Sequence, residues 1–115
     1  MDHLDETFQQ RLLRMIDERG LADPEVYKKA NLDRKLFSKI RCNKDYVPKK
    51  KTALALALAL QLNLDDTKDL LGSAGLALSN SNKADVIISF CIENEIYDIF
   101  EINALLFQYE QPLLG

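Results

Sequence analysis

The sequence is poor in the residues from which most enzymes build an active site. Its 115 residues include one histidine, His3, and two cysteines, Cys42 and Cys91. A lone histidine near the terminus excludes His-based catalytic triads and paired-histidine metal sites. No Cys-x-x-Cys, P-loop or Gly-x-Gly-x-x-Gly motif occurs either. We therefore expect no enzyme activity, no metal ion and no cofactor.

Long hydrophobic runs are also missing. The longest is residues 53–60, an alternation of Ala and Leu, whereas a helix that spans a bilayer needs about 20 apolar residues. The two cysteines lie far apart, and no secretory signal precedes them, so a disulfide framework is unsupported. These features predict one soluble globular domain in the cytoplasm, without a membrane partner.

The formal net charge of −3 at first argues against a nucleic-acid partner, but the charge is unevenly distributed. Residues 1–26 carry a net −4, residues 27–51 a net +8 and residues 52–115 a net −7. A segment this basic attracts anionic polymers to one face, while the acidic flanks repel them from the rest. The alternative is an ordinary solvated surface.

Capping residues and apolar spacing predict an all-α fold. We expect Asp23, Asp33 and either Asp65 or Asp66 to cap helices, and Asn31 and Asn43 to end two of them in the left-handed conformation. The alternating run at 53–60 has the period of a strand but the composition of a helix, and its apolar circumference predicts a central, buried position. Residues 83–93 contain Val86-Ile87-Ile88, yet we predict a helix there, because an isolated strand would have no pairing partner. Further helices are expected from residue 5 to Gly20, from 65 to near Gly75 and from Asp98 to Pro112.

The predicted helix at about residues 33–42 separates into two faces. At about 100° per residue, Leu36, Phe37 and Ile40 share one apolar sector, while the basic side chains lie opposite. Two short helices joined by a tight turn and followed by a buried helix indicate a helix-turn-helix, whose second helix reads base edges in the major groove. The candidate base contacts are Arg34, Lys35, Ser38 and Lys39. The candidate phosphate contacts are Lys28, Lys29, Arg41, Lys44, Lys49, Lys50 and Lys51.

Residues 23–64 also carry the pattern of a known family. Val26 and Leu32 form an apolar pair across the turn, and Phe37 and Ile40 are apolar residues three apart in the next helix. Pro48 precedes the fourth helix, and Ala57 with Leu60 forms an Ala-x-x-Leu within it. This pattern resembles the lambda-repressor-like helix-turn-helix of the Cro and xenobiotic-response-element type. The resemblance implies a five-helix domain over residues 5–75 that binds double-stranded DNA.

Three positions depart from the family. Asn31 and Asn43 replace glycines, which is tolerable because Asn adopts positive φ more readily than other non-glycine residues. Tyr27 stands where the family favours alanine at the close crossing of two helices. A phenol there would widen the crossing or turn outward, where its hydroxyl could meet a phosphate.

Residues 76–115 form an apolar, acidic extension outside the family domain. Two helices this apolar either pack on the five-helix core or form a homodimer interface through residues 83–110, and Leu113 and Leu114 could dock in a groove of this or another chain. Our leading hypothesis is a DNA-binding transcriptional regulator. The alternative, from another class, is a non-catalytic protein-interaction or antitoxin-like module with a protein partner on the same fold.

Overall fold

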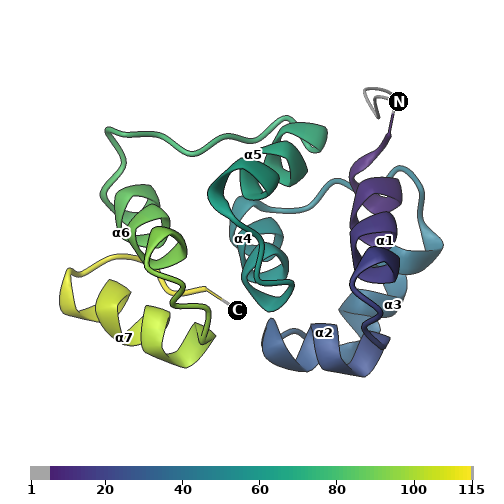
Figure 1. The fold of residues 1–115 in the computed structure, drawn as a ribbon, viewed down its shortest axis with the longest axis horizontal. Coiled ribbons are helices and arrows are strands. Elements are labelled where there is room, and N and C mark those ends of the chain that lie inside the picture. Colours follow the sequence, from purple (N-terminus) through teal and green to yellow (C-terminus); the bar gives the residue numbers. More distant parts are fainter. Residues whose placement is uncertain (1–5, 115) are drawn as a thin grey trace.

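The computed structural model describes residues 6–114, and His3 lies outside them. These residues form seven α-helices and no strand, so the predicted all-α class and the helix at residues 83–93 are confirmed (Figure 1). No helix in this range combines the length and apolarity that crossing a membrane requires. The helices are α1 (Phe8–Glu18), α2 (Asp23–Lys29), α3 (Arg34–Cys42), α4 (Lys50–Ala59), α5 (Leu64–Ser73), α6 (Lys83–Glu93) and α7 (Ile99–Gln108).

Helix α4 is the centre of the fold. Every residue from Ala53 to Leu60 is buried, as the apolar circumference predicted. The helix packs against α5, α2 and α7, and it lies in the middle of the ribbon (Figure 1). Ala and Leu alternate here without forming a strand, because both are strong helix formers and a helix buried on all sides needs no polar stripe.

The helix starts correct several predicted caps. Asn63, not Asp65 or Asp66, caps α5, because its side chain accepts a hydrogen bond from the Asp66 amide (2.8 Å). Asp23 is the first residue of α2 and caps nothing, so that prediction is wrong. Asp33 occupies the N-cap position of α3, but its side chain accepts no capping hydrogen bond.

Six of the seven helices end in the same way, with a left-handed residue after the last turn. In each case the amide of the following residue donates to a carbonyl five residues back, which satisfies an otherwise free acceptor. The left-handed residues are Gly20, Asn31, Gln61, Gly75, Glu95 and Glu110. The prediction for Asn31 (φ 55°) is confirmed. The prediction for Asn43 is wrong, because α3 ends there in an extended conformation (φ −127°).

The C-terminal extension packs on the rest of the chain. Helix α6 contacts α5, and α7 contacts α4. The tail folds back on α7, where the Asn103 side chain accepts a hydrogen bond from the Leu114 amide (2.7 Å) and donates one to the Leu114 carbonyl (2.8 Å). Leu114 is thereby 4% exposed, whereas Leu113 is 46% exposed. One of the two terminal leucines is therefore docked in this chain's own core.

The left-handed backbone conformation of Gln61, after the end of α4, predicts that a glycine there would stabilise the protein. Its side chain is exposed, and its φ of 54° is unfavourable for any residue with a Cβ. We expect Gln61→Gly to raise the free energy of unfolding by about 0.5 to 1 kcal/mol, measured by urea denaturation. Gln61→Ala keeps the Cβ and is the matched control. Equal stabilities of the two variants would contradict the explanation.

Candidate nucleic-acid interface

A tight turn joins α2 to α3. The Leu32 amide donates to the Tyr27 carbonyl (2.9 Å), and Asn31 supplies the left-handed residue that reverses the chain. Val26 of α2 and Phe37 of α3 are both buried, and the two helices contact each other. The chain thus presents the remaining face of α3 to solvent.

Helix α3 has the two faces that its sequence predicted. Phe37 and Ile40 are buried and Leu36 is half-buried. The four residues predicted to contact bases are all exposed: Arg34, Lys35, Ser38 and Lys39. The predicted separation into an apolar edge and a basic edge is confirmed, and contact of these side chains with DNA stays a prediction.

Tyr27 lies between α2 and α3. Its side chain is half-buried, with the ring centroid 5.8 Å from that of Phe37 and the two ring planes inclined at 46°. The aromatic ring therefore contributes to the packing of α2 on α3, which is a different role from the phosphate contact predicted for it.

Two neighbouring helices hold the end of α3. Arg41 makes a two-pronged ion pair with Asp23, with Nε–Oδ2 and Nη2–Oδ1 distances of 2.7 Å. These hydrogen bonds raise the pKa of Arg41, so the guanidinium stays charged. The Gln9 side chain of α1 donates to the Arg41 carbonyl (2.6 Å). Asp23, predicted as a cap, acts instead as the anchor that orients α3.

Lys50 is engaged by an acidic residue of another helix. Its ammonium pairs with Asp85 of α6, which is 3% exposed and also accepts a hydrogen bond from the Ser79 amide (2.9 Å). A buried carboxylate is costly unless it is paired, so this contact joins the start of α4 to the extension. Lys50 was predicted from sequence to contact phosphate, and nothing local could have indicated a partner 35 residues away.

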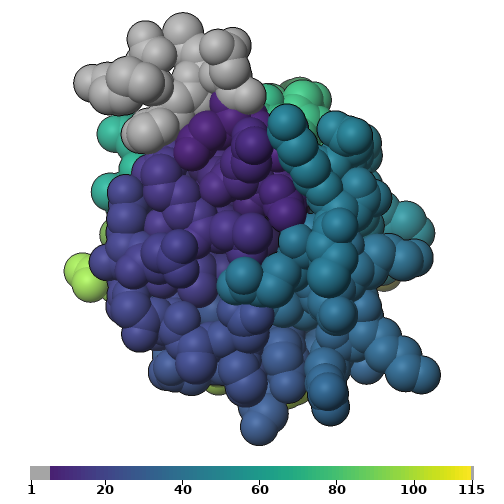
Figure 2. Space-filling model, turned by 90° about the vertical axis from the view of Figure 1, so that its right-hand side faces the viewer, coloured from purple at the N-terminus to yellow at the C-terminus, as the bar shows by residue number. Residues whose placement is uncertain are grey.

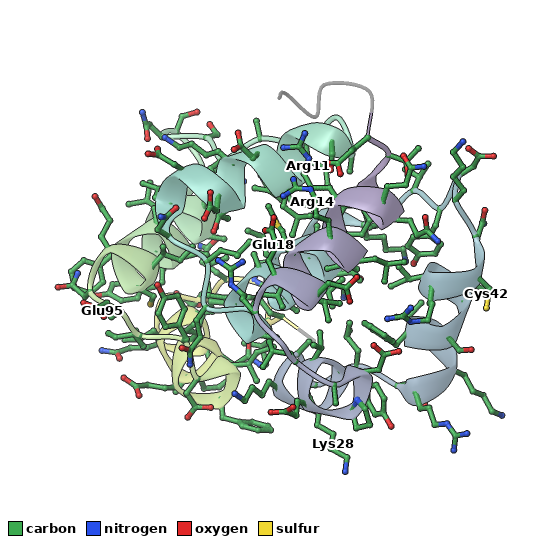
Figure 3. All side chains as sticks on the ribbon, turned by 45° about the vertical axis from the view of Figure 1, so that its right-hand side comes forward. Arg11, Arg14, Glu18, Lys28, Cys42 and Glu95 are labelled. Carbon is green, nitrogen blue, oxygen red and sulfur yellow. The ribbon has the colours of Figure 1, made fainter. Side chains whose placement is uncertain are left out.

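The arginines of α1 and its end are likewise paired internally. Arg14 hydrogen-bonds Glu6 (2.8 Å) and Glu18 (3.1 Å), and the Glu6 contact raises the pKa of Arg14. Arg19 lies 3.7 Å from Asp66. Figure 3 shows Arg14 and Glu18 together along α1, while Lys28 and Cys42 project outward from α2 and α3.

The basic segment is different, because most of its cations have no partner. Within residues 6–114, eight exposed side chains of the segment form no ion pair: Lys28, Lys29, Arg34, Lys35, Lys39, Lys44, Lys49 and Lys51. Figure 2 views the molecule from the side of α1 and α3, and long side chains of this segment stand out from its right and lower edges. We call these eight residues the basic face. Clustered unpaired charge repels itself and attracts anions.

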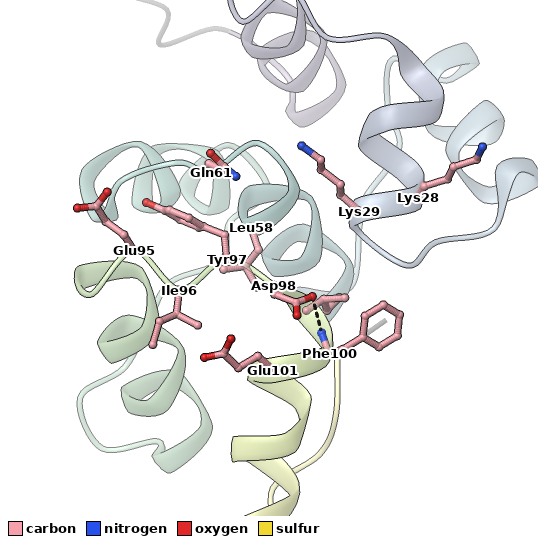
Figure 4. Close-up of a pocket in the computed structure, with 11 residues that line it drawn as sticks. Lys28, Lys29, Leu58, Gln61, Glu95, Ile96, Tyr97, Asp98, Phe100 and Glu101 are labelled. Atoms are coloured by element: carbon pink, nitrogen blue, oxygen red, sulfur yellow. Dashed lines mark hydrogen bonds between the residues drawn. The ribbon is translucent and has the colours of Figure 1, made fainter.

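A hollow of about 640 Å³ lies beside the basic face, between the end of α2, the end of α4 and the start of α7. Lys29 extends toward Gln61 on one side, while Asp98 and Glu101 lie on the other and Lys28 points away (Figure 4). Asp98 is occupied as the cap of α7, accepting from the Phe100 amide (3.3 Å). Lys28 and Lys29 of the basic face line this hollow together with the carboxylates, which make its α7 side unfavourable for a polyanion.

No group of three or more potential metal ligands occurs in the described part of the chain. Comparison with protein-family models, curated proteins and solved structures finds no match to this chain. The residues that sequence reasoning missed are Gln9, Asp23 in its anchoring role, and Asp85. Each acts on a residue remote in sequence.

The Lys50–Asp85 pair predicts unequal effects of three adjacent lysines. Lys50→Met leaves a buried carboxylate with one hydrogen bond, and we expect it to lower the free energy of unfolding by about 2 kcal/mol. Lys49→Met and Lys51→Met remove exposed, unpaired ammonium groups, and we expect changes within about 0.5 kcal/mol. Thermal or urea denaturation of the three variants measures the difference. Three equal values would mean that the pair contributes nothing to docking of the extension.

Proposed function

We propose that this protein binds double-stranded DNA and acts as a transcriptional regulator, with α3 entering the major groove. The observation that carries the proposal is the basic face: eight exposed cations without internal partners, in a chain whose other arginines are paired. The exposed order Arg34, Lys35, Ser38 along the first turns of α3 matches the part of a recognition helix that reaches base edges. The resemblance of residues 23–64 to lambda-repressor-like domains supports the same arrangement.

Phosphate contact and base contact fall on different residues. Arginine and lysine at the start of α3 suit guanine O6 and N7. The lysines of the basic face outside α3 suit phosphates, whereas Lys50 and Arg41 are already engaged by Asp85 and Asp23. We therefore leave Lys50 and Arg41 out of the phosphate set that the proposal uses.

The salt dependence of DNA affinity tests the proposal. If about six phosphates are neutralised, log K should fall with log[salt] at a slope near −5, measured by fluorescence anisotropy on random duplexes. Replacing Arg34, Lys35 and Lys39 together by Glu should abolish binding. Lys68→Glu changes an exposed, unpaired lysine of α5 and is the control. No affinity at low salt, or equal loss in the control, would refute the proposal.

Cys42 supplies a second measurement that needs no substitution. It is exposed at the end of α3, whereas Cys91 is buried and its burial raises the pKa of its thiol, an effect to which Glu101 adds. A maleimide should therefore label Cys42 in the native protein and leave Cys91 unmodified. Saturating duplex should slow labelling of Cys42 several-fold. An unchanged rate would place the DNA elsewhere on the protein.

A protein-interaction module remains the second candidate function, because α7 carries two highly exposed aromatic rings, Phe100 (65%) and Phe107 (76%). The antitoxin-like alternative would use such a surface to bind a protein partner, and the basic face would contact an acidic surface of that partner. Purification at high salt distinguishes the two functions. A stoichiometric protein partner with no retained DNA supports this second candidate, and bound DNA that salt releases supports the first.

A further inference from the structure

Helix α6 has an outward face that no part of the described chain covers. Its inward residues Asp85, Ile88, Cys91 and Ile92 are buried. Four outward residues are exposed, and at about 100° per residue they fall within a sector of about 80°. In chain order they are Lys83, Val86 (46% exposed), Phe90 (56% exposed) and Glu93. We call them the α6 stripe.

The α6 stripe is complementary to itself. A base stands at one end, an acid at the other and two apolar residues between them. When two copies of a helix cross antiparallel about a two-fold axis at the level of residue 88, position 83 of each meets position 93 of the other, and 86 meets 90. Each Lys83 then faces a Glu93 and each Val86 faces a Phe90, twice over, as an isologous interface requires.

The charges at the ends of the stripe are available for this purpose. Neither Lys83 nor Glu93 takes part in an ion pair within residues 6–114. Lys83 is also the single basic residue among residues 76–115, which carry six acids. Two such acidic extensions would repel each other in most relative orientations. The antiparallel register places the one available cation of each copy against an acid of the other.

The surface beside the stripe can receive a side chain of a second copy. Val86, Ile87 and Phe90 line a hollow of about 280 Å³ together with Leu105 and Tyr109 of the α7 segment. An aromatic ring that enters such a hollow is the usual anchor of a protein interface. The stripe alone is smaller than the roughly 800 Å² per partner of a standard interface, so this hollow is needed to extend it.

We propose that the protein forms a two-fold homodimer through the α6 stripe, with α6 antiparallel to α6 of the second copy. The occupant of this face is a second copy, because the stripe supplies both members of each ion pair. A foreign partner would have to bring a matching acid and base at the same spacing. The proposal is independent of DNA binding, since α3 lies at the other end of the molecule from α6 (Figure 1).

A charge-exchange series, studied by sedimentation equilibrium without DNA, tests the dimer. Lys83→Glu and Glu93→Lys each place like charges opposite one another and should weaken dimerisation at least tenfold. The double variant K83E/E93K restores opposite charges across the axis and should recover most of the wild-type affinity. Failure of the double variant to recover would overturn the antiparallel register.

A second pair of variants tests which apolar face is used. Phe90→Asp should give a monomer, whereas Phe107→Asp removes a more exposed ring from α7 and should leave the dimer intact. Circular dichroism checks that both variants fold, as their exposure leads us to expect. A wild-type protein that is monomeric at all concentrations would refute the proposal. So would a dimer that dissociates in Phe107→Asp and persists in Phe90→Asp.

Discussion

The fold depends on the burial of α4 on all its sides. The three leucines of this helix are almost completely removed from water, and each such side chain contributes about 1.5 to 3 kcal/mol relative to an exposed one. Their shielding requires α2, α5 and α7 to lie around them, so the contact that stabilises the core also sets where the other helices stand. The small alanines between the leucines allow these neighbours to approach closely. Functional surfaces are therefore confined to the outer helices.

The charges divide into groups that are paired within the chain and groups that are not. Where an ionic group serves the fold it is paired: Arg41 with Asp23 behind α3, and Lys50 with Asp85 between α4 and α6. The first pair joins α2 to α3 and the second joins α4 to α6, so each adds a link between two helices beyond their apolar packing. The cations of the basic face have no such role, and their mutual repulsion costs stability. An external anion offsets that cost, which is why unpaired cations are better evidence for a binding surface than the net charge of a segment.

The sequence predicts the local features of this structure and misses the long-range ones. The all-α class, the buried position of residues 53–60 and the two faces of α3 follow from residue type and spacing. Helix ends are harder to predict. Neighbouring polar residues compete for a cap position, and Asn63 caps α5 where Asp65 or Asp66 was expected. The same residue type also adopts different conformations at two helix ends, because Asn31 is left-handed and Asn43 is extended. The partners of Lys50 and Arg41 were beyond sequence reasoning, since ion pairs across 35 and 18 residues leave no periodic signal.

The positions of α3 and α6 determine how the basic face and the α6 stripe are arranged relative to each other. The ribbon sets these helices at opposite ends, with α4 between them (Figure 1). The Lys50–Asp85 pair connects the start of α4, at the end of the basic segment, directly to α6. A connection of this kind transmits orientation, because rotation of α6 about its axis would separate the buried Asp85 carboxylate from the half-buried Lys50. If the protein dimerises through the α6 stripe, the same pair therefore fixes the direction in which each copy presents its basic face. Under the proposed function, Lys50 would then act on DNA binding through geometry, while its ammonium stays engaged by Asp85.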